Sequence, residues 1–425
     1  MKKGDFNYIS YINILKEELI PAMGCTEPIA LAYAAAKARE TLGQLPDRVV
    51  IDASGSIIKN VKSVIVPNTD HLKGMPAAAV AGIIAGNSDK KLEVISDVTS
   101  SQISDMKKYL NNTKIEVNHI DNGSVFDIII TVFKDDSYAK VRIIDYHTNI
   151  VLIEKDGNIL YQADSSNKCN DGLTDRSILN LSDIFDFANT VDIEDIREVI
   201  GRQIEYNYAI ALEGLKGDYG SNIGKILLEA YGDNILIRAK AMAAAGSDAR
   251  MNGCELPVVI NSGSGNQGLT TSLPVIEYAK ELNVGEEKMY RALVLANLVT
   301  IHQKTSIGRL SAFCGAVSAG AGAGAGIAYL HGADLNAISH TVINAIVTTG
   351  GMVCDGAKAS CASKIAASVE ASILGYNMHI HGKDFLSGDG LVGDSAEQTI
   401  KNIGRLAKDG MKFTNEEIIK IMIGK

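Results

Sequence analysis

The hydrophobic pattern of this chain changes character once, at about residue 180, and this change limits the folds open to it. From Asp47 to about Tyr161, short runs rich in β-branched residues lie between turn signals, as is typical of strands. Helical stretches near Pro76–Ala85 and Ile103–Leu110 interrupt them. After about Asn180 the apolar residues recur at helical spacing. We therefore predict an α+β fold: an N-terminal α+β domain with a largely antiparallel sheet, followed by an all-α helical bundle. The runs expected as strands are RVVIDAS, KLEVIS, KIEVNHI, VFDIIITVF, AKVRIID and NIVLIEK.

The N-terminal segment and one polar stretch set the expected domain boundaries. Residues 7–43 look helical, with an interruption at PAMGCTEP, where Pro28 suits the first turn of a second helix. Residues 162–175 (QADSSNKCNDGLTD) are polar and rich in turn residues, which indicates a linker. We predict one domain over residues 1–175, containing the helix that carries Cys25, and an all-α domain over residues 176–425.

The stretch from Leu310 to Ala333 contains no formally charged residue, but it does not read as a membrane span. It is rich in Gly and Ala, and four glycines recur at every second position from Gly320 to Gly326. Each interior glycine costs a helix roughly 1 kcal/mol relative to alanine, so a close neighbour must offset the loss. We predict a buried helix packed against another helix or a cofactor.

Composition and charge limit the class of protein, its partners and its compartment. A hydrophobic fraction of 46% and a charged fraction of 21% are ordinary for a globular protein. The net charge of −9 argues against nucleic acid or an anionic membrane as partner. Six cysteines in 425 residues do not resemble a disulfide framework, and the charged N-terminal segment lacks an apolar signal core. A cytoplasmic protein with a small-molecule substrate is expected, and the glycine-rich helices are compatible with a homodimer.

Three cysteines form the most distinctive constellation. Cys314, Cys354 and Cys361 are spaced C-x39-C-x6-C and lie at breaks between predicted helices. Helix N-termini carry partial positive charge that stabilises thiolates, so these positions suit metal binding. Three ligands leave one coordination position open. The spacing lacks the C-x2-C pairs of zinc ribbons and the C-x2-C-x2-C run of ferredoxins, and isolated buried thiols are a plainer alternative.

The segment NSGSGNQG (residues 261–268) literally contains G-x-G-x-x-G. No βαβ pattern surrounds it, and no acidic residue ends a second strand about 20 positions later, which argues against a dinucleotide site. Small residues let backbone N–H groups converge on an anion, and the polar side chains add donors suited to an amino-acid carboxylate. A plain turn is the alternative. The candidate substrate-binding residues here are Ser262, Ser264, Gly265, Asn266 and Gln267.

Together, PAMGCTEP, NSGSGNQG and GMVCDGAKASCA resemble the L-cysteine desulfidase family, relatives of the iron–sulfur L-serine dehydratases through their alpha-chain domain. The resemblance spans almost the whole chain, from Cys25 to the last helices. It implies a [4Fe–4S] cluster bound by Cys314, Cys354 and Cys361. It also implies a lyase, independent of pyridoxal phosphate, that converts L-cysteine and water into pyruvate, ammonia and sulfide. An iron that lacks a protein ligand can act as a Lewis acid towards the substrate sulfur.

The same resemblance assigns removal of the Cα proton to Cys25. Its place in the first turn of a helix predicts a lowered thiol pKa, although a buried structural thiol would look the same in sequence. Further candidates are weaker, because surface lysines, turn asparagines and satisfied histidines are common. They are Lys59, Asn60, Asn68 and Thr69 upstream, and His302, Lys304 and Lys358 around the ligand cysteines.

Other functions stay open at this point. The same parts could dehydrate L-serine, or an intact cluster could carry sulfide for a partner without catalysis. A zinc-stabilised structural protein is a third class.

The two remaining cysteines are not expected in the cluster. Cys169 is interpreted as an exposed linker thiol. Cys254 is the one other thiol that could bind a fourth iron and so close the open position.

Overall fold

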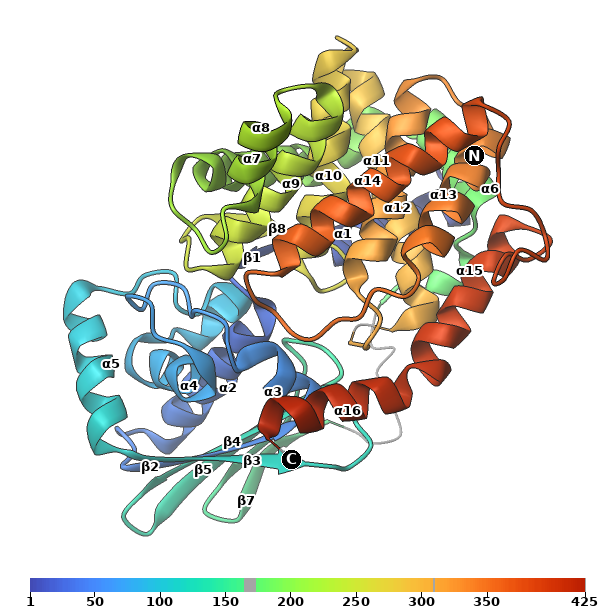
Figure 1. Cartoon of the computed structure of the whole chain (residues 1–425). Coiled ribbons are helices and arrows are strands. Elements are labelled where there is room, and N and C mark those ends of the chain that lie inside the picture. Colours follow the sequence, from blue (N-terminus) through green and yellow to red (C-terminus); the bar gives the residue numbers. More distant parts are fainter. Residues whose placement is uncertain (164–172, 309, 425) are drawn as a thin grey trace.

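Two regions of different architecture follow one another along the chain. The computed structural model describes residues 1–163, 173–308 and 310–424 (Figure 1). A mixed sheet with its covering helices, drawn in blue and cyan, occupies one side of the molecule. The other side is a helical bundle drawn from green to red. The predicted α+β class, with a helical bundle after the sheet, is confirmed.

A six-stranded sheet organises the first region. Its strands are β2 (Arg48–Ser54), β3 (Lys114–Ile120), β4 (Asp127–Lys134), β5 (Ser137–Ile144), β6 (Ile150–Lys155) and β7 (Asn158–Gln162). They lie in the order β3-β2-β4-β5-β6-β7. Only the β2–β3 pair of this sheet is parallel, so the predicted largely antiparallel sheet is confirmed. Strand β4 is mostly buried because helix α2 (Thr26–Leu42) packs across β4, β5 and β6. The other helices of this region are α3 (Gly55–Val61), α4 (Gly74–Ala85) and α5 (Ser100–Asn112).

One run that was expected to form a strand does not. KLEVIS (residues 91–96) lies in the 3-10 helix η1 (Ser88–Glu93) and the turn that follows it. The side chains of Leu92, Val94 and Ile95 are buried, and η1 packs against α2. The prediction was wrong because a short apolar cluster can cover a helix face as readily as it can alternate between the faces of a sheet.

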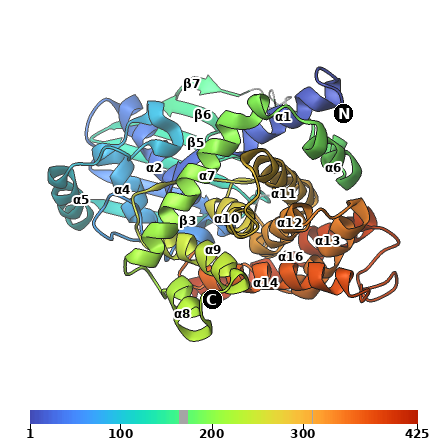
Figure 2. The same cartoon turned by 90° about the horizontal axis from the view of Figure 1, so that it is seen from above.

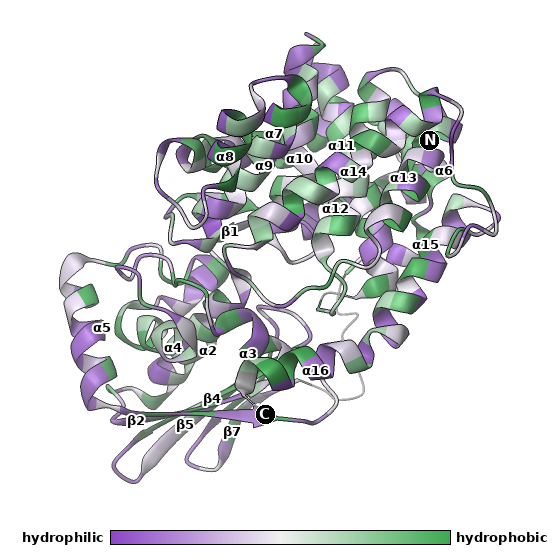
Figure 3. Ribbon diagram, in the orientation of Figure 1, coloured by the Kyte–Doolittle hydropathy of each residue, from purple (hydrophilic) through white to green (hydrophobic). Residues whose placement is uncertain are grey.

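The helical region is built around a central helix, α12. Its elements are α6 (Leu181–Thr190), α7 (Ile193–Lys216), α8 (Ile223–Tyr231), α9 (Ile235–Met251), α10 (Gly265–Glu281), α11 (Glu286–Ile307), α12 (Gly315–Leu330), α13 (Leu335–Thr349), α14 (Cys361–Ile380), α15 (Ala396–Arg405) and α16 (Lys412–Ile423). Helix α12, pale and green in Figure 3, contacts α10, α11, α13 and α14. Helix α10 lies between α9 and α12 (Figure 2). In the part of the chain that the structure describes, no helix is long and apolar enough to cross a membrane.

The two ends of the chain cross between the regions. As predicted, the N-terminal helical segment is interrupted, giving α1 (Phe6–Glu18), the short strand β1 (Pro21–Met23) and then α2. Strand β1 pairs antiparallel with β8 (Pro257–Val259), and α1 contacts α7 and α11. At the other end, α16 returns to pack against α3 (Figure 1). The division into domains near residue 175 stays a prediction.

The glycines of α12 are explained by helix packing. A Cβ added at Gly320 would lie 2.7 Å from the carbonyl oxygen of Ser368 on α14. At Gly322 the added atom would lie 2.5 Å from the carbonyl oxygen of Ala296 on α11. One turn further along the helix, a Cβ at Gly324 would lie 2.7 Å from Cβ of Ser372 on α14, and a Cβ at Gly326 would meet Val275 on α10 and Ala292 on α11. Because no Cβ separates the backbones, α12 packs closely against two neighbours at once, and the buried helix expected from the sequence is confirmed.

Substitution Gly322→Ala is expected to lower the free energy of unfolding by about 1–3 kcal/mol, because the new methyl group meets backbone that cannot move independently. Chemical denaturation of the variant and the parent protein measures the difference. The matched control is Gly351→Ala, an exposed position where an added Cβ meets nothing within 4 Å. Equal losses in both variants would contradict the packing argument.

Candidate functional site

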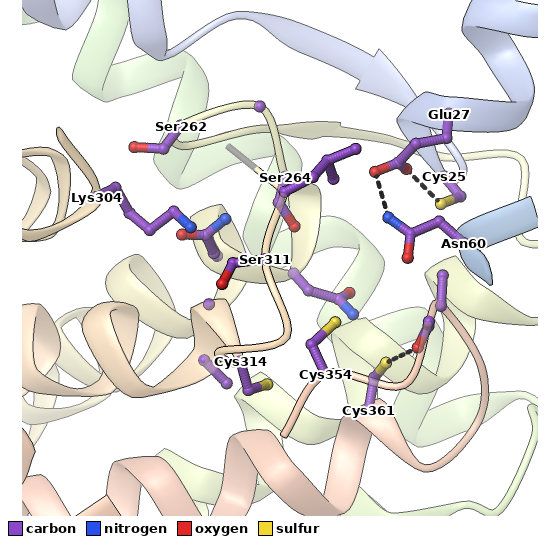
Figure 4. Close-up of a pocket in the computed structure, with 18 of the residues that line it drawn as sticks. Cys25, Glu27, Asn60, Ser262, Ser264, Lys304, Ser311, Cys314, Cys354 and Cys361 are labelled. Atoms are coloured by element: carbon purple, nitrogen blue, oxygen red, sulfur yellow. Dashed lines mark hydrogen bonds between the residues drawn. The ribbon is translucent and has the colours of Figure 1, made fainter. Parts of the chain in front are cut away.

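Three cysteines from two segments line one cavity between α12 and α14 (Figure 4). Cys314 is the N-cap of α12, and Cys361 is the first residue of α14. Cys354 lies opposite Cys314 because backbone hydrogen bonds join their segments: the Cys314 N–H donates to Met352 at 3.1 Å, and the Cys354 N–H donates to Ala312 at 2.6 Å. Two of the thiols therefore lie at the positive ends of helices, as the sequence predicted.

The spacing of the sulfur atoms bears on the kind of metal centre they fit. In the described residues, one group of His, Cys, Asp or Glu ligand atoms lies mutually within 4.8 Å, and it contains no cysteine. A single zinc ion, with Zn–S bonds of about 2.3 Å, holds its tetrahedral thiolates about 3.8 Å apart. A cluster separates them further, because each thiolate binds a different iron. The donor set thus fits an iron–sulfur cluster with three protein ligands better than a zinc ion.

Burial and the nearby cations shift the pKa values of Cys314 and Cys361 in opposite directions. Burial, and then the neighbouring Cys354, raises the pKa of Cys314 to about 12. Burial also raises the pKa of Cys361. The nearby cations Lys364 and Arg250 act in the opposite direction, but they do not outweigh burial. Cys314 and Cys361 therefore keep their protons at neutral pH unless a cation binds, and metal binding would release them.

Lys59 is buried beneath the cysteine segments. Its ammonium donates to the carbonyl oxygens of Ser311 at 3.4 Å and Cys354 at 3.3 Å, and to Oδ1 of Asn415 at 2.8 Å. Burial lowers its pKa, and only 2% of the residue is exposed. This lysine joins α3 to both cysteine segments and to α16, and it does not line the cavity.

Cys25 enters the same cavity from the other region. It is the N-cap of α2 and follows Gly24, whose φ of +56° turns the chain out of β1. Its thiol donates to Oε2 of Glu27 at 3.0 Å, and Nδ2 of Asn60 donates to Oε1 of the same carboxylate at 2.9 Å. Burial, and then the charge of Glu27, raises the pKa of Cys25 well above its usual value. The lowered pKa predicted from the sequence is wrong, because burial of the thiol, and then the charge of the Glu27 carboxylate, outweigh the helix terminus.

A histidine from the sheet region completes this corner of the cavity. His147 lies in the turn between β5 and β6, and its ring packs edge-on against Phe126 with the centroids 4.8 Å apart. Its Nε2 lies 4.0 Å from Oε1 of Glu27, beyond hydrogen-bond distance. Burial would raise the pKa of Glu27, but His147 and the thiol hydrogen bond lower it to about 2. The carboxylate is therefore ionised next to a thiol that carries its proton.

The glycine-rich loop lies between β8 and α10. Asn261 and Ser264 close a tight turn through reciprocal backbone hydrogen bonds of 3.1 and 3.0 Å, with positive φ at Ser262 and Gly263 between them. The Thr26 hydroxyl donates to the Gly263 carbonyl at 3.0 Å, which ties the loop to the start of α2. The Ser262 hydroxyl donates to the Asn261 side chain at 2.8 Å. The loop is thus held rigidly beside Cys25.

An arginine packs against the first turn of α10. A Cβ on Gly265 would lie 2.2 Å from Nε of Arg250, so only glycine leaves room for the guanidinium. Arg250 lies on α9, is 2% exposed, and donates from Nη1 to Oδ1 of Asn266 at 3.0 Å. Gly315 makes space in the same way for Gln267, since a Cβ there would lie 2.7 Å from the amide carbon. Two small residues therefore let two polar side chains line the cavity.

Four buried polar atoms that line this cavity have no hydrogen-bond partner among the residues that the structure describes. They are Oδ1 of Asn60, Nε2 of His147, Nε of Arg250 and Oε1 of Gln267. Buried polar groups are nearly always satisfied, because an unpaired one costs about 1–3 kcal/mol. Several such atoms around one cavity are typical of a site that a polar ligand completes.

The structure brings together most of the residues nominated from the sequence. Those lining the cavity are Cys25, Asn60, Ser262, Ser264, Asn266, Gln267, Lys304, Cys314, Cys354 and Cys361. Gly265 lies at its edge against Arg250.

Other nominated residues lie elsewhere. His302 pairs with Glu397 at 2.8 Å, and Lys358 pairs with Asp355 at 2.5 Å. Neither lines the cavity, and neither does Cys254, which is buried. Asn68 and Thr69 line a separate depression. Cys169 falls outside the described residues.

The titratable residues Glu27, Arg250 and His147 of the cavity were not nominated from the sequence. Glu27 stands two positions after Cys25, and this short spacing could have identified it as a neighbour of the thiol. Arg250 lies in the last turn of α9, within the region for which the sequence predicted only helices. His147 carries no local signal, because only the folding of the sheet region brings it next to Glu27.

Comparisons with known proteins agree on one family. The family model described as serine dehydratase alpha chain matches residues 89–420. A UPF0597 protein of Desulfitobacterium hafniense is 60% identical over 425 residues, covering 100% of this chain and 99% of the relative. A UPF0597 protein of Lachnoclostridium phytofermentans is 52% identical over 416 residues, covering 98% and 100%. One from Aeromonas hydrophila is 39% identical over 425 residues, covering 98% and 97%.

Proposed function

The chain belongs to the serine dehydratase alpha-chain family, and we propose that it is a lyase that eliminates sulfide from L-cysteine. The Cα–H bond and the Cβ–S bond break, the proton passes to the protein, and the sulfur leaves with its electron pair. The resulting aminoacrylate tautomerises and takes up water to give pyruvate and ammonia. No pyridoxal phosphate takes part.

The observation that carries this proposal is the set of unpartnered polar atoms around the cavity. A donor, Nε of Arg250, and two acceptors, Oδ1 of Asn60 and Oε1 of Gln267, lie buried there. A zwitterionic amino acid supplies the complementary groups, a carboxylate for the guanidinium and an ammonium for the amide oxygens. The N-terminus of α10 adds backbone N–H groups on the carboxylate side. Gly265 and Gly315 have no Cβ, and so leave room for the side chains of Arg250 and Gln267 beside the cavity.

Cys314, Cys354 and Cys361 would hold a [4Fe–4S] cluster, which supplies a Lewis-acidic iron for the leaving sulfur. The protein contributes the charge balance around it. Lys59 donates to the carbonyl oxygen of Cys354, and Lys364 donates to that of Val353 at 2.9 Å. These buried or half-buried cations offset the negative charge of thiolates.

Cys25 is the proposed acceptor of the Cα proton. Its thiol donates to Glu27, so the thiol must lose its proton before it can act as a base. Glu27, which accepts the thiol hydrogen bond, is the proposed first acceptor of that proton, while Nε2 of His147 lies 4.0 Å from the carboxylate, beyond direct hydrogen-bond distance. Asn60 orients the carboxylate from the other side. An arriving ammonium group also favours the thiolate by its charge.

L-serine dehydration is the second candidate, with hydroxide rather than sulfide as the leaving group. The description of the matching family model favours it. The two reactions use the same carboxylate and ammonium contacts and the same base, so they differ in the affinity of the metal centre for sulfur or oxygen. A metal centre rich in sulfide and thiolate prefers the softer sulfur ligand.

The test is an anaerobic assay of pyruvate formation from L-cysteine and from L-serine, with the parent protein and Arg250→Lys. We expect a larger kcat/KM for L-cysteine. Lysine cannot reproduce the planar contact of the guanidinium, so KM is expected to rise about 10- to 100-fold, since a charged hydrogen bond contributes about 1.5–3 kcal/mol.

The control variant is Arg197→Lys, at a half-exposed arginine of α7 that pairs with Glu194 and Glu286. Its kinetics should match those of the parent protein. A larger kcat/KM for L-serine would replace the desulfidase proposal with the dehydratase. No pyruvate from either amino acid, with the cluster intact, would favour a protein that carries sulfide without catalysis.

A further inference from the structure

A second cluster of potential metal ligands lies at the other end of α14 from Cys361. His340 on α13, His379 in the last turn of α14 and Asp384 in the loop after it have ligand atoms that all lie within 4.8 Å of one another. Nδ1 of His379 lies 2.9 Å from Oδ2 of Asp384, and Nδ1 of His340 lies 3.6 Å from the same oxygen. The imidazole rings are nearly parallel, with an interplanar angle of 11° and centroids 5.3 Å apart.

The carboxylate is held in position by a buried asparagine. Nδ2 of Asn344, one helical turn after His340 on α13, donates to Oδ1 of Asp384 at 2.9 Å. Its Oδ1 accepts the Phe385 N–H at 3.1 Å. The loop reaches this position because the chain reverses at Gly382, whose φ is +64°. One carboxylate oxygen is thus fixed by Asn344, and the other is presented to both histidines, which is how outer-shell hydrogen bonds orient a metal ligand.

Hydrogen bonds within the protein do not satisfy all the polar atoms of this cluster. Nδ1 of His340 is buried and has no hydrogen-bond partner in the described part of the chain, while Nδ1 of His379 is already hydrogen-bonded to Oδ2 of Asp384. Two imidazole nitrogens therefore converge on one oxygen atom, although hydrogen bonding requires only one of them. A cation placed between the three atoms would satisfy all of them.

We propose that His340, His379 and Asp384 bind a divalent transition-metal ion, with Zn²⁺ the best match. Two imidazole nitrogens and one carboxylate oxygen suit zinc, whereas magnesium and calcium prefer oxygen ligands. The ion binds Nδ1 of each histidine in the tautomer that carries its proton on Nε2. The side chains are 14–28% exposed, so a metal ion can enter from solvent and keep water as a further ligand.

The site is distinct from the cysteine cavity and does not depend on the proposed lyase activity. Eighteen residues separate Cys361 from His379 along α14, which corresponds to about 27 Å at 1.5 Å per residue. The ion would fasten the last turn of α14 and the following loop to α13. Its function at this place is to hold two helices of the bundle together rather than to contact substrate.

Zinc soaks of crystals of the whole protein, grown anaerobically, test the location directly. Anomalous diffraction at the zinc edge is expected to show a peak about 2.0–2.2 Å from Nδ1 of both histidines and from a carboxylate oxygen of Asp384. Zinc bound by the cysteine thiols gives a separate peak, so the two sites cannot be confused. A soak that fills only the cysteine cavity, or no site, would overturn the proposal.

Competition with a chromophoric zinc chelator measures the same site in solution. The parent protein is expected to bind one more equivalent of zinc than His379→Ala, or to bind it at least about tenfold more tightly. The matched control is His381→Ala, an exposed histidine two residues further along that bonds only its own helix, and it should bind like the parent. Asp384→Asn keeps the shape of the side chain and should also weaken binding. Equal zinc binding by the parent and both ligand variants would refute the site.

Discussion

Substitution of Cys25 by serine is expected to reduce kcat about 10³-fold while the protein keeps its iron–sulfur cluster. A positioned general base contributes about 10²–10⁴-fold, and a serine hydroxyl is far too weak an acid to be ionised in its place. Cys25 lies across the cavity from the three cysteines proposed as cluster ligands and bonds Glu27, so its loss leaves their segments intact. Anaerobic kinetics, together with the visible absorption and iron content of the same sample, measure both parts of the result.

The pH dependence of kcat/KM tests the same role of Cys25, and the direction of the change can be predicted. Cys25 must be a thiolate to accept a proton, and burial with the charge of Glu27 raises its pKa well above the usual value. The kcat/KM of the parent enzyme should therefore still rise with pH on the alkaline side of neutrality. Glu27→Gln removes the negative charge, lowers the pKa of the thiol and should move the rising limb to lower pH. A shift to higher pH, or unchanged activity in Cys25→Ser, would remove Cys25 from the mechanism.

The control for this variant is Cys254→Ser. Cys254 is also a buried thiol, but it does not line the cavity. We expect its activity to stay within a few-fold of the parent. If Cys254→Ser and Cys25→Ser lost activity equally, the effect would reflect damage to packing rather than loss of a base.

Substitution of Cys354 by alanine is expected to abolish cluster binding and activity together. The backbone hydrogen bond from residue 354 to Ala312 does not involve the side chain, so the loop should keep its course. Two thiolates are then left for a centre that needs three, and the iron content should fall from about four per chain to near zero. We expect the anaerobically purified parent protein to be brown and this variant to be colourless.

Metal analysis of the parent protein separates the cluster from the zinc alternative. A colourless, zinc-loaded protein purified without oxygen would contradict the cluster, as would a Cys354→Ala variant that keeps its iron. Circular dichroism of the variant shows whether the fold survives. Retained helical content with lost iron is the expected combination, because the helices around the site are held mainly by packing of α12 against its neighbours.

Local patterns in the sequence were sufficient for much of the fold. The glycine series from Gly320 to Gly326 predicted a helix in close contact with another, and α11 and α14 both approach it at those positions. The cap positions of Cys25 and Cys314 also followed from neighbouring residues. The KLEVIS run failed because burial alone does not distinguish a strand from a short helix that covers α2.

The sequence by itself determined which residue types could do the chemistry: three thiols at helix starts, a fourth in the loop before α14, and a loop of small polar residues, because capping and turn formation are local properties of the chain. Only the tertiary structure decided what surrounds them. Pairing of β1 with β8 places Cys25 beside the glycine-rich loop, 237 residues away at the Thr26–Gly263 contact. Packing of α9 brings in Arg250, and the turn after β5 brings in His147. The ionisation of Cys25 was likewise decided there, because desolvation and the Glu27 charge depend on every element that closes the cavity, not on the helix that carries the thiol.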